Sequence, residues 1–184
     1  MTVHYLSFSA EIMPQPTEQL IAASSMLVNQ GATEIHLLLS TPGGSVMHGI
    51  TIYNTLRALP VRLVTHNMGN VDSIGNVIFL AGQERFACPN ATFMFHGVGR
   101  DTGPGIRLED KMLREALDSI DADHRRIGSI IGRHTTLNEA QVVELFTEAR
   151  TKDAAWAEQT GMINAIREPQ IPSGVPIHSL VFAR

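Results

Sequence analysis

Residues 34–59, EIHLLLSTPGGSVMHGITIYNTLRAL, decide the fold of this chain. The apolar run Glu34–Leu39 predicts a strand, and Thr41-Pro42-Gly43-Gly44 predicts a turn directly after it. Val46–Leu59 then carries apolar side chains at helical spacing, and Pro60 ends the predicted helix. A strand, a glycine-rich turn and a helix in this order are the repeating unit of a sheet that helices cover.

The same unit occurs on both sides of this stretch. Upstream, a strand is expected at Val3–Phe8 and a helix at Thr17–Gln30, which stops at Gly31. The repetition predicts an α/β fold with a mostly parallel sheet. Downstream, the expected elements are a strand at Arg62–Thr65, a helix from Ser73 to Ala81, and short strands at Arg85–Ala87 and Thr92–Phe95.

The second half of the chain is expected to be richer in helix. A Gly-rich loop, Gly97–Gly105, leads into a long, charged amphipathic helix at Ile106–Ile131. Two shorter helices, Leu137–Glu148 and Asp153–Thr160, precede an apolar strand at Met162–Ile166. We expect a single domain over 1–184, with a head core at 1–105 and 153–166, the long and following helices at 106–148, and an irregular, proline-rich tail at 167–184.

The composition excludes several classes of protein. Of the 184 residues, 43% are hydrophobic and only 17% are charged, and the net charge is −4. These values exclude a disordered chain and give no basic face for nucleic acid. Because about a quarter of the residues are charged in an ordinary soluble protein, the low charge favours a homo-oligomer that hides surface in an interface.

The sequence carries no signal for a membrane or for secretion. No apolar stretch approaches the roughly 20 residues that span a bilayer, and residues 1–5 lack the regions of a signal peptide. The single cysteine, Cys88, fits a reducing compartment, so a cytoplasmic protein is expected. No Cys/His cluster has the spacing of metal ligands, so neither a metal nor an organic cofactor is expected.

Two glycine-rich turns are the candidate site, because each follows a predicted strand and precedes a predicted helix. They are residues 40–45 (STPGGS) and 69–75 (GNVDSIG). Such turns meet at one edge of a parallel sheet, where glycines let backbone N–H groups point at an oxyanion. Neither turn matches a phosphate-binding motif. Ser73 is therefore a candidate nucleophile, and the amide of Ile74 could then donate to the oxyanion. The alternative is that Ser73 only forms the N-cap of the helix.

A nucleophilic serine needs a base. Of the eight histidines, His96 differs from the others because it ends the predicted strand Thr92–Phe95 and precedes Gly97, where a strand passes into a loop. His96 is therefore the candidate general base. Other histidines lie in predicted strands (His36, His66), on or beside the long helix (His124, His134), or near the termini (His4, His178).

The stretch Leu37–His96 resembles the proteolytic subunit of the Clp protease family, in the crotonase-like superfamily. The motifs keep their order and spacing without a large gap, and a fainter match covers residues 161–166 (GMINAI). The matching residues are Ser40-Thr41-Pro42-Gly43-Gly44-Ser45-Val46 with Gly49 and Ile52-Tyr53, Gly69-x-x-x-Ser73-x-Gly75, Ala81-Gly82, Pro89-Asn90-Ala91 and Met94-Phe95-His96.

The resemblance implies a fold, an assembly and a set of site residues. The fold is a crotonase-like superhelix of ββα units with a protruding long helix, here Ile106–Ile131. Subunits of the family form heptameric rings, two of which stack through that helix into a tetradecamer around the active sites. The resemblance also implies Ser73 as nucleophile, His96 as general base, and an oxyanion hole from the Gly44 and Ile74 amides.

The family's catalytic triad ends in an aspartate that this sequence does not match. Counting back from Gly161 reaches Ala149, and counting forward from Leu137 reaches Thr147. Glu148 lies between these positions and is taken as the third member, with Asp153 as the alternative. Another acceptor, or none, stays open at this point.

Two further positions depart from the family pattern. Asp72 stands where the family usually carries a small apolar residue. Its carboxylate either repels the oxyanion and raises the pKa of His96, or points away and caps the helix. The family's N-terminal segment engages an ATP-driven AAA+ unfoldase, whereas here the first strand begins almost at Met1. That segment is expected to be missing, which weakens the case for an unfoldase partner.

Together these residues favour a ClpP-like serine endopeptidase that hydrolyses short or unfolded polypeptides inside an oligomeric chamber. One alternative is a protease-like subunit that assembles without cutting, which the missing aspartate favours. The other is a crotonase-type acyl-CoA enzyme, which does not need the Ser73–His96 pair.

Overall fold

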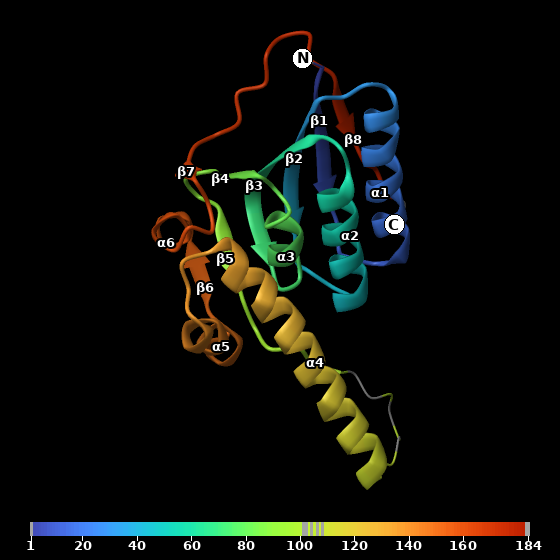
Figure 1. Cartoon of the computed structure of the whole chain (residues 1–184), viewed down its shortest axis with the longest axis vertical. Coiled ribbons are helices and arrows are strands. Elements are labelled where there is room, and N and C mark those ends of the chain that lie inside the picture. The colour runs from blue at the N-terminus through green and yellow to red at the C-terminus, as the bar shows by residue number, and fades with distance from the viewer. Residues whose placement is uncertain (1, 101–102, 104, 106, 108, 183–184) are drawn as a thin grey trace.

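The computed structural model describes residues 2–100, 103, 105, 107 and 109–182. Strands and helices alternate through the first half of the chain, and the longest helix follows residue 109 (Figure 1). In chain order the elements are β1 (Val3–Ser9), α1 (Pro14–Asn29), β2 (Glu34–Thr41), α2 (Val46–Ala58), β3 (Arg62–Asp72), α3 (Gly75–Phe79), β4 (Glu84–Ala87), β5 (Thr92–Met94), α4 (Asp110–His134), α5 (Glu139–Glu148), β6 (Thr151–Asp153), α6 (Ala154–Gln159), β7 (Ala165–Ile166) and β8 (Ile177–Ser179).

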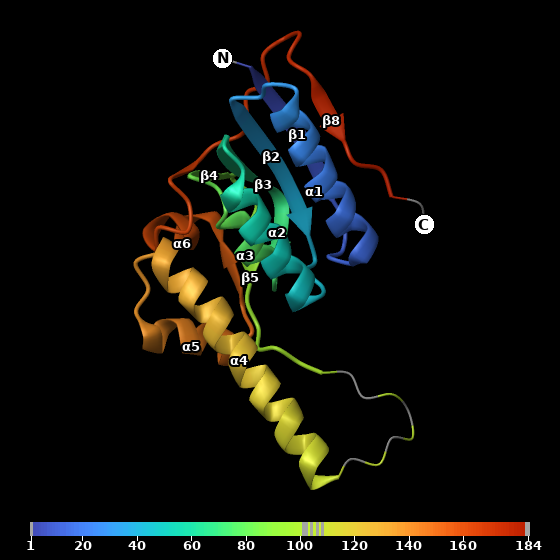
Figure 2. The ribbon, with the colours of Figure 1, turned by 45° about the vertical axis from the view of Figure 1, so that its right-hand side comes forward.

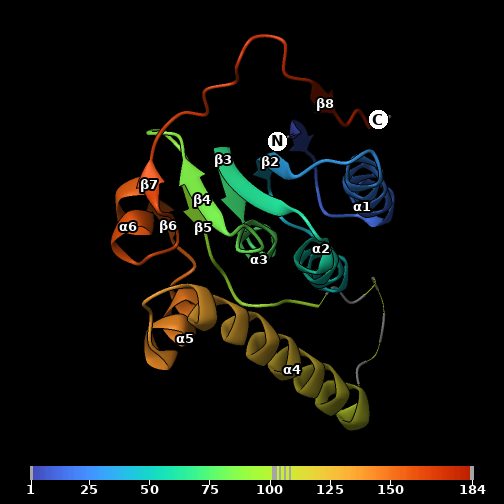
Figure 3. The same ribbon diagram turned by 45° about the horizontal axis from the view of Figure 1, so that its top comes forward.

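The strands form one sheet with β2 near its middle. The order is β6-β5-β3-β2-β1-β8, and β4 pairs with β3 and β7. Among the described residues every pairing is parallel except that of β5 with β6. Helices α1, α2 and α3 cover one face of this sheet (Figures 2 and 3). The predicted α/β fold with a mostly parallel sheet is confirmed.

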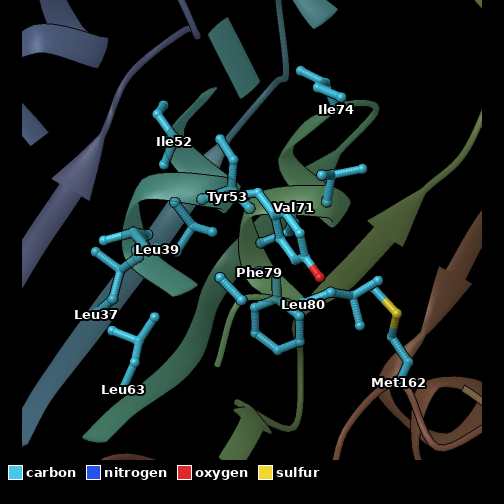
Figure 4. Close-up of a cluster of buried hydrophobic side chains, with 14 of the residues drawn as sticks. Leu37, Leu39, Ile52, Tyr53, Leu63, Val71, Ile74, Phe79, Leu80 and Met162 are labelled. Carbon is cyan, nitrogen blue, oxygen red and sulfur yellow. The ribbon is translucent and has the colours of Figure 1, made fainter. Parts of the chain in front are cut away.

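The core between the sheet and these helices holds the two glycine turns in place. Leu37 and Leu39 of β2, Ile52 of α2 and Phe79 of α3 are at most 1% exposed and pack in one cluster (Figure 4). Burial of one such side chain stabilises the fold by about 1.5–3 kcal/mol. These residues lie on β2, α2 and α3, the elements that flank the turns. Their packing therefore holds the turns in place.

Strand β3 is longer than the sequence predicts. It runs to Asp72 rather than Thr65, so Gly69 lies inside it instead of starting a turn. The extension has partners on both sides: Thr41 of β2 pairs with Val71, after a bulge, and β5 pairs with residues 70–72. The predicted helix from Ser73 to Ala81 shortens to α3, and Ser73 falls in the turn before it.

Helix α4 projects away from the sheet (Figures 1 and 2). It extends to His134, past the predicted end at Ile131, and its predicted first residue, Ile106, lies outside the described residues. Its C-terminal part packs on the body of the protein through the buried Ile127 and Ile131. No described helix combines the length and the apolar character that a membrane crossing needs.

The C-terminal tail contains a strand that the sequence did not predict. β8 pairs in parallel with β1, in the register Tyr5 to Ile177. The strand is present because the outer edge of β1 offers backbone groups that need partners. The predicted strand Met162–Ile166 is reduced to Ala165–Ile166, the two residues that pair with β4. Met162 and Ile163 are buried in the core.

A chain of polar side chains lies on the sheet beside Phe86. The Nδ1 atom of His36 lies 2.9 Å from Nε2 of His66, and its Nε2 lies 2.7 Å from a Glu34 oxygen. His66 is 3% exposed, and burial, followed by the charges of His36 and Arg167, lowers its pKa to about 4. His66 is therefore neutral in the folded protein over the range in which a free histidine takes up a proton.

We expect this burial to make the fold sensitive to acid. The unfolded chain protonates His66 near pH 6.5 and the folded chain only near 4, so the free energy of unfolding decreases as the pH falls through that window. The loss at His66 amounts to about 3 kcal/mol. His134 adds to it, because burial and Arg85 also lower its pKa to about 4. Urea unfolding of the wild type and of His66→Phe between pH 4 and 7 measures the effect; equal pH dependence in both would contradict it.

Candidate active site

The turn after β2 and the turn after β3 meet at a cavity of about 240 Å³. It lies where β2, β3 and β5 end, and the buried face of α4 closes one side. The structure therefore brings together Gly44, Ser73, Ile74 and His96, four of the predicted site residues. The lining residues are Gly44, Val46, Ser73, Ile74, Phe95, His96, Gly97, Val98, Gly99, Ile127, Ile131 and Phe146.

Ser73 sits in a strained turn between β3 and α3. Its φ is 54°, in the left-handed region that residues other than glycine rarely adopt. Its amide donates to the Met94 carbonyl at 2.8 Å, and its own carbonyl accepts from the Asn76 amide at 3.1 Å. The Ser73 side chain does not cap α3. A sharp strand-to-helix turn of this kind presents a serine hydroxyl to a cavity.

Glycines allow the two turns to touch. A Cβ atom on Gly43 would lie 2.6 Å from the Cβ of Ser73, and one on Gly75 would lie 2.4 Å from Cγ2 of Thr41. Both distances are far shorter than real carbon contacts. A side chain at either position would therefore push the Ser73 turn away from the β2 turn.

Two backbone amides at the cavity are free to bind an oxyanion. The residues on either side of Gly44 are hydrogen-bonded to Ile12. The Ile12 amide donates to the Gly43 carbonyl at 2.7 Å, and the Ser45 amide donates to the Ile12 carbonyl at 2.9 Å. Within the described residues, neither the Gly44 nor the Ile74 amide donates a hydrogen bond to the protein. Both amides lie on the cavity, and a pair of N–H groups of this kind is suited to a negatively charged oxygen.

His96 follows β5 and is exposed at the cavity. Its Nδ1 atom lies 2.7 Å from the Gly97 carbonyl oxygen. Because a carbonyl only accepts, Nδ1 carries the proton and Nε2 is left with a free lone pair. No hydrogen bond joins the Ser73 hydroxyl to His96 in the residues described; such bonds are often loose in ligand-free enzymes.

Neither Glu148 nor Asp153 is hydrogen-bonded to His96 among the described residues. Glu148 pairs with Lys152 at 2.8 Å, and that hydrogen bond lowers the pKa of Glu148. Asp153 accepts from the Trp156 amide at 2.8 Å and so caps α6. In the described part of the chain the acceptor at His96 Nδ1 is the Gly97 carbonyl, which local sequence patterns do not reveal.

One interpretation of the sequence expected Asp72 to cap the helix that follows it. The structure shows no side-chain cap at the start of α3. Its carboxylate accepts a hydrogen bond of 2.7 Å from the Asn70 side chain. Asn70 also donates to the Thr41 carbonyl at 3.2 Å and so ties β3 to β2. Asp72 is not among the residues that line the cavity. The carboxylate thus holds the Asn70 side chain, which makes the contact between the two strands.

No three His, Cys, Asp or Glu side chains gather closely enough to hold a metal ion in the residues that the structure describes. The cavity instead offers a hydroxyl, an imidazole and two free amides. This set fits acyl transfer through a serine nucleophile.

The strain at Ser73 has a measurable consequence. We expect Ser73→Gly to be more stable than Ser73→Ala by about 1 kcal/mol, because glycine adopts a positive φ without the Cβ penalty that alanine retains. Both variants lack the hydroxyl, so the difference isolates the backbone. Urea unfolding of the two variants measures it, and equal stability would show that the turn is unstrained.

The comparisons with known proteins concern the family of this chain. A family model described as Clp protease matches residues 4–170. The chain is 30% identical over 142 residues to the ATP-dependent Clp protease proteolytic subunit 1 of Streptomyces avermitilis, a match that covers 74% of this chain and 62% of that protein. It is 31% identical over 140 residues to proteolytic subunit 3 of Streptomyces coelicolor, covering 73% and 61%. The chain therefore spans less than two thirds of the length of these relatives.

A solved structure has the same fold. A point mutant of ClpP1 from Listeria monocytogenes superimposes with a TM-score of 0.79 at 21% identity, covering 90% of this chain and 92% of that one. This match confirms the expected crotonase-like fold. Since the family model covers most of the sequence, including both glycine turns and His96, the chain belongs to the Clp protease family.

Proposed function

We propose that this chain is a serine endopeptidase that hydrolyses peptide bonds in short or unfolded polypeptides. The observation that carries the proposal is Ser73, held at φ 54° on the cavity that also contains His96 and two free amides. Strained residues of this kind concentrate at catalytic sites, and they persist only where the surrounding fold holds them in place. The names of the relatives support the same chemistry.

In the proposed reaction the Ser73 oxygen attacks the carbonyl carbon of a peptide bond, and its proton passes to Nε2 of His96. The carbonyl oxygen becomes an oxyanion that accepts from the amides of Gly44 and Ile74. His96 then gives its proton to the leaving amine, and the C–N bond breaks. Water attacks the acyl-serine in the same way, which releases the second product and restores Ser73.

The Gly97 carbonyl takes the place of the triad carboxylate in this proposal. Removal of the carboxylate from a serine protease triad lowers kcat by about 10⁴, largely because the histidine adopts the wrong tautomer. Here the hydrogen bond of 2.7 Å from Nδ1 keeps the correct tautomer. A neutral carbonyl stabilises the imidazolium less than a carboxylate does, so we expect a slow enzyme rather than an inactive one.

We also propose that the protein works as a heptameric ring, two of which stack into a tetradecamer. Supporting this, α4 carries Met112, Leu113 and Leu117 at 43%, 46% and 60% exposure, which is costly for apolar side chains in water. Stacked rings would cover this helix and enclose the cavities, so folded proteins would be excluded.

For folded proteins, an AAA+ unfoldase is the proposed partner, since the relatives are named as ATP-dependent. The single thiol, Cys88, supports a cytoplasmic location.

An assembly subunit that does not cut is the second candidate. It is favoured by one observation, that neither Glu148 nor Asp153 is hydrogen-bonded to His96 among the described residues. Labelling of the serine distinguishes this reading from the peptidase.

We expect a fluorophosphonate probe to label Ser73, with the adduct located by mass spectrometry. His96→Ala should slow labelling by at least about 100-fold, because the serine loses its general base. An unlabelled wild type that forms ring-sized assemblies by light scattering would overturn the peptidase in favour of the assembly subunit. Micromolar binding of acyl-CoA without labelling would favour the crotonase-type reading.

The two nearby carboxylates provide a separate test. Glu148→Gln and Asp153→Asn should each change the labelling rate by less than about threefold, because an exposed ion pair contributes little and asparagine still caps a helix. The rates are measured beside the wild type, with His96→Ala as the slow reference. A loss of about 100-fold or more in either variant would identify that carboxylate as the third member of the triad.

A further inference from the structure

We propose that His124, on α4, is a positioning residue for His96, and this inference rests on the proposed peptidase function. The two histidines are joined through one peptide group, the one between Gly97 and Val98. Its carbonyl accepts from Nδ1 of His96 at 2.7 Å. Its N–H donates to Nε2 of His124 at 2.8 Å.

The planarity of the peptide bond makes this link directional. In a trans peptide the C=O and N–H bonds lie in one plane and point in opposite directions. When His124 fixes the direction of the Val98 N–H, it therefore also fixes the direction of the Gly97 carbonyl. That carbonyl sets the tautomer and the ring orientation of His96, so the position of His124 is transmitted to the general base.

The same link strengthens the acceptor. Hydrogen bonds in a chain polarise one another, and a peptide group whose N–H is donating has a more negative carbonyl oxygen. The Gly97 carbonyl faces the histidine on which positive charge develops when Ser73 loses its proton. A better acceptor stabilises that charge, which is the role of the carboxylate in an ordinary triad.

The ring of His124 is itself held in place. It stacks on Phe146 of α5, with ring centroids 4.9 Å apart and planes 13° from parallel. Gly97 allows the close approach, because a Cβ there would lie 3.3 Å from Nε2 of His124 and 3.4 Å from the Phe146 carbonyl oxygen. Because Nε2 accepts a hydrogen bond from Val98, the ring proton of His124 lies on Nδ1.

Two variants separate the hydrogen bond from the packing. His124→Phe keeps a flat ring on Phe146 and removes the acceptor, whereas His124→Gln loses the ring and keeps an acceptor oxygen near the position of Nε2. We expect His124→Phe to lower the maximal rate of fluorophosphonate labelling at least about tenfold with little change in the affinity for the probe. His124→Gln should recover most of the rate. Asp121→Asn, on the exposed side of α4, is the control and should match the wild type.

A second readout does not depend on activity. Nitrogen-15 spectra of the histidine-labelled protein, with His96 assigned from His96→Ala, report which ring nitrogen carries the proton. We expect Nδ1–H in the wild type and in His124→Gln, and a mixture of tautomers in His124→Phe. An unchanged tautomer and labelling rate in His124→Phe would overturn the inference. An unlabelled wild type whose His96 tautomer still depends on His124 would overturn the proposed function while supporting the inference.

Discussion

The contact between the turn after β2 and the turn after β3 is the constraint on which the site depends. Gly43 and Gly75 bring the two backbones so close that a Cβ at either position would lie within 2.6 Å of the opposite turn. This approach sets Ser73 at a positive φ and puts Gly44 and Ile74 on the same cavity. The strain is tolerated because the core beneath the turns is fully buried and leaves no room for relaxation.

Among the described residues, His96, the proposed general base, is oriented by a backbone carbonyl rather than by a carboxylate. His96 donates to Gly97, and the same peptide group donates to His124, which stacks on Phe146. The region around Glu148 and Asp153, where the family pattern leads one to look for an acid, is used for other purposes: a pair with Lys152 and a cap on α6. A site of this design keeps the tautomer that acyl transfer needs and gives up part of the electrostatic stabilisation of the imidazolium.

Much of the sheet and its helices was predictable, because alternating apolar segments and glycine turns encode them locally. The errors arose where a partner strand decided the outcome. β3 continues through Gly69 because β2 and β5 both pair with its last residues, and β8 forms in a proline-rich tail because it pairs with β1. Asp72, interpreted as a possible cap, is bound by Asn70. The strand pairings leave no pattern in neighbouring residues, whereas the Asn70–Asp72 contact joins two residues of the same strand.

The sequence by itself determined the strand–turn–helix units and pointed to Ser73 and His96, because glycines at turns and a histidine at a strand end are local features. Only the tertiary structure decided what holds His96. His124 is on another element, and it reaches Val98 because α4 packs on the body through Ile127 and Ile131. That packing is a sum of many nonpolar contacts between distant segments, so the hydrogen bond it permits is visible only in the folded chain.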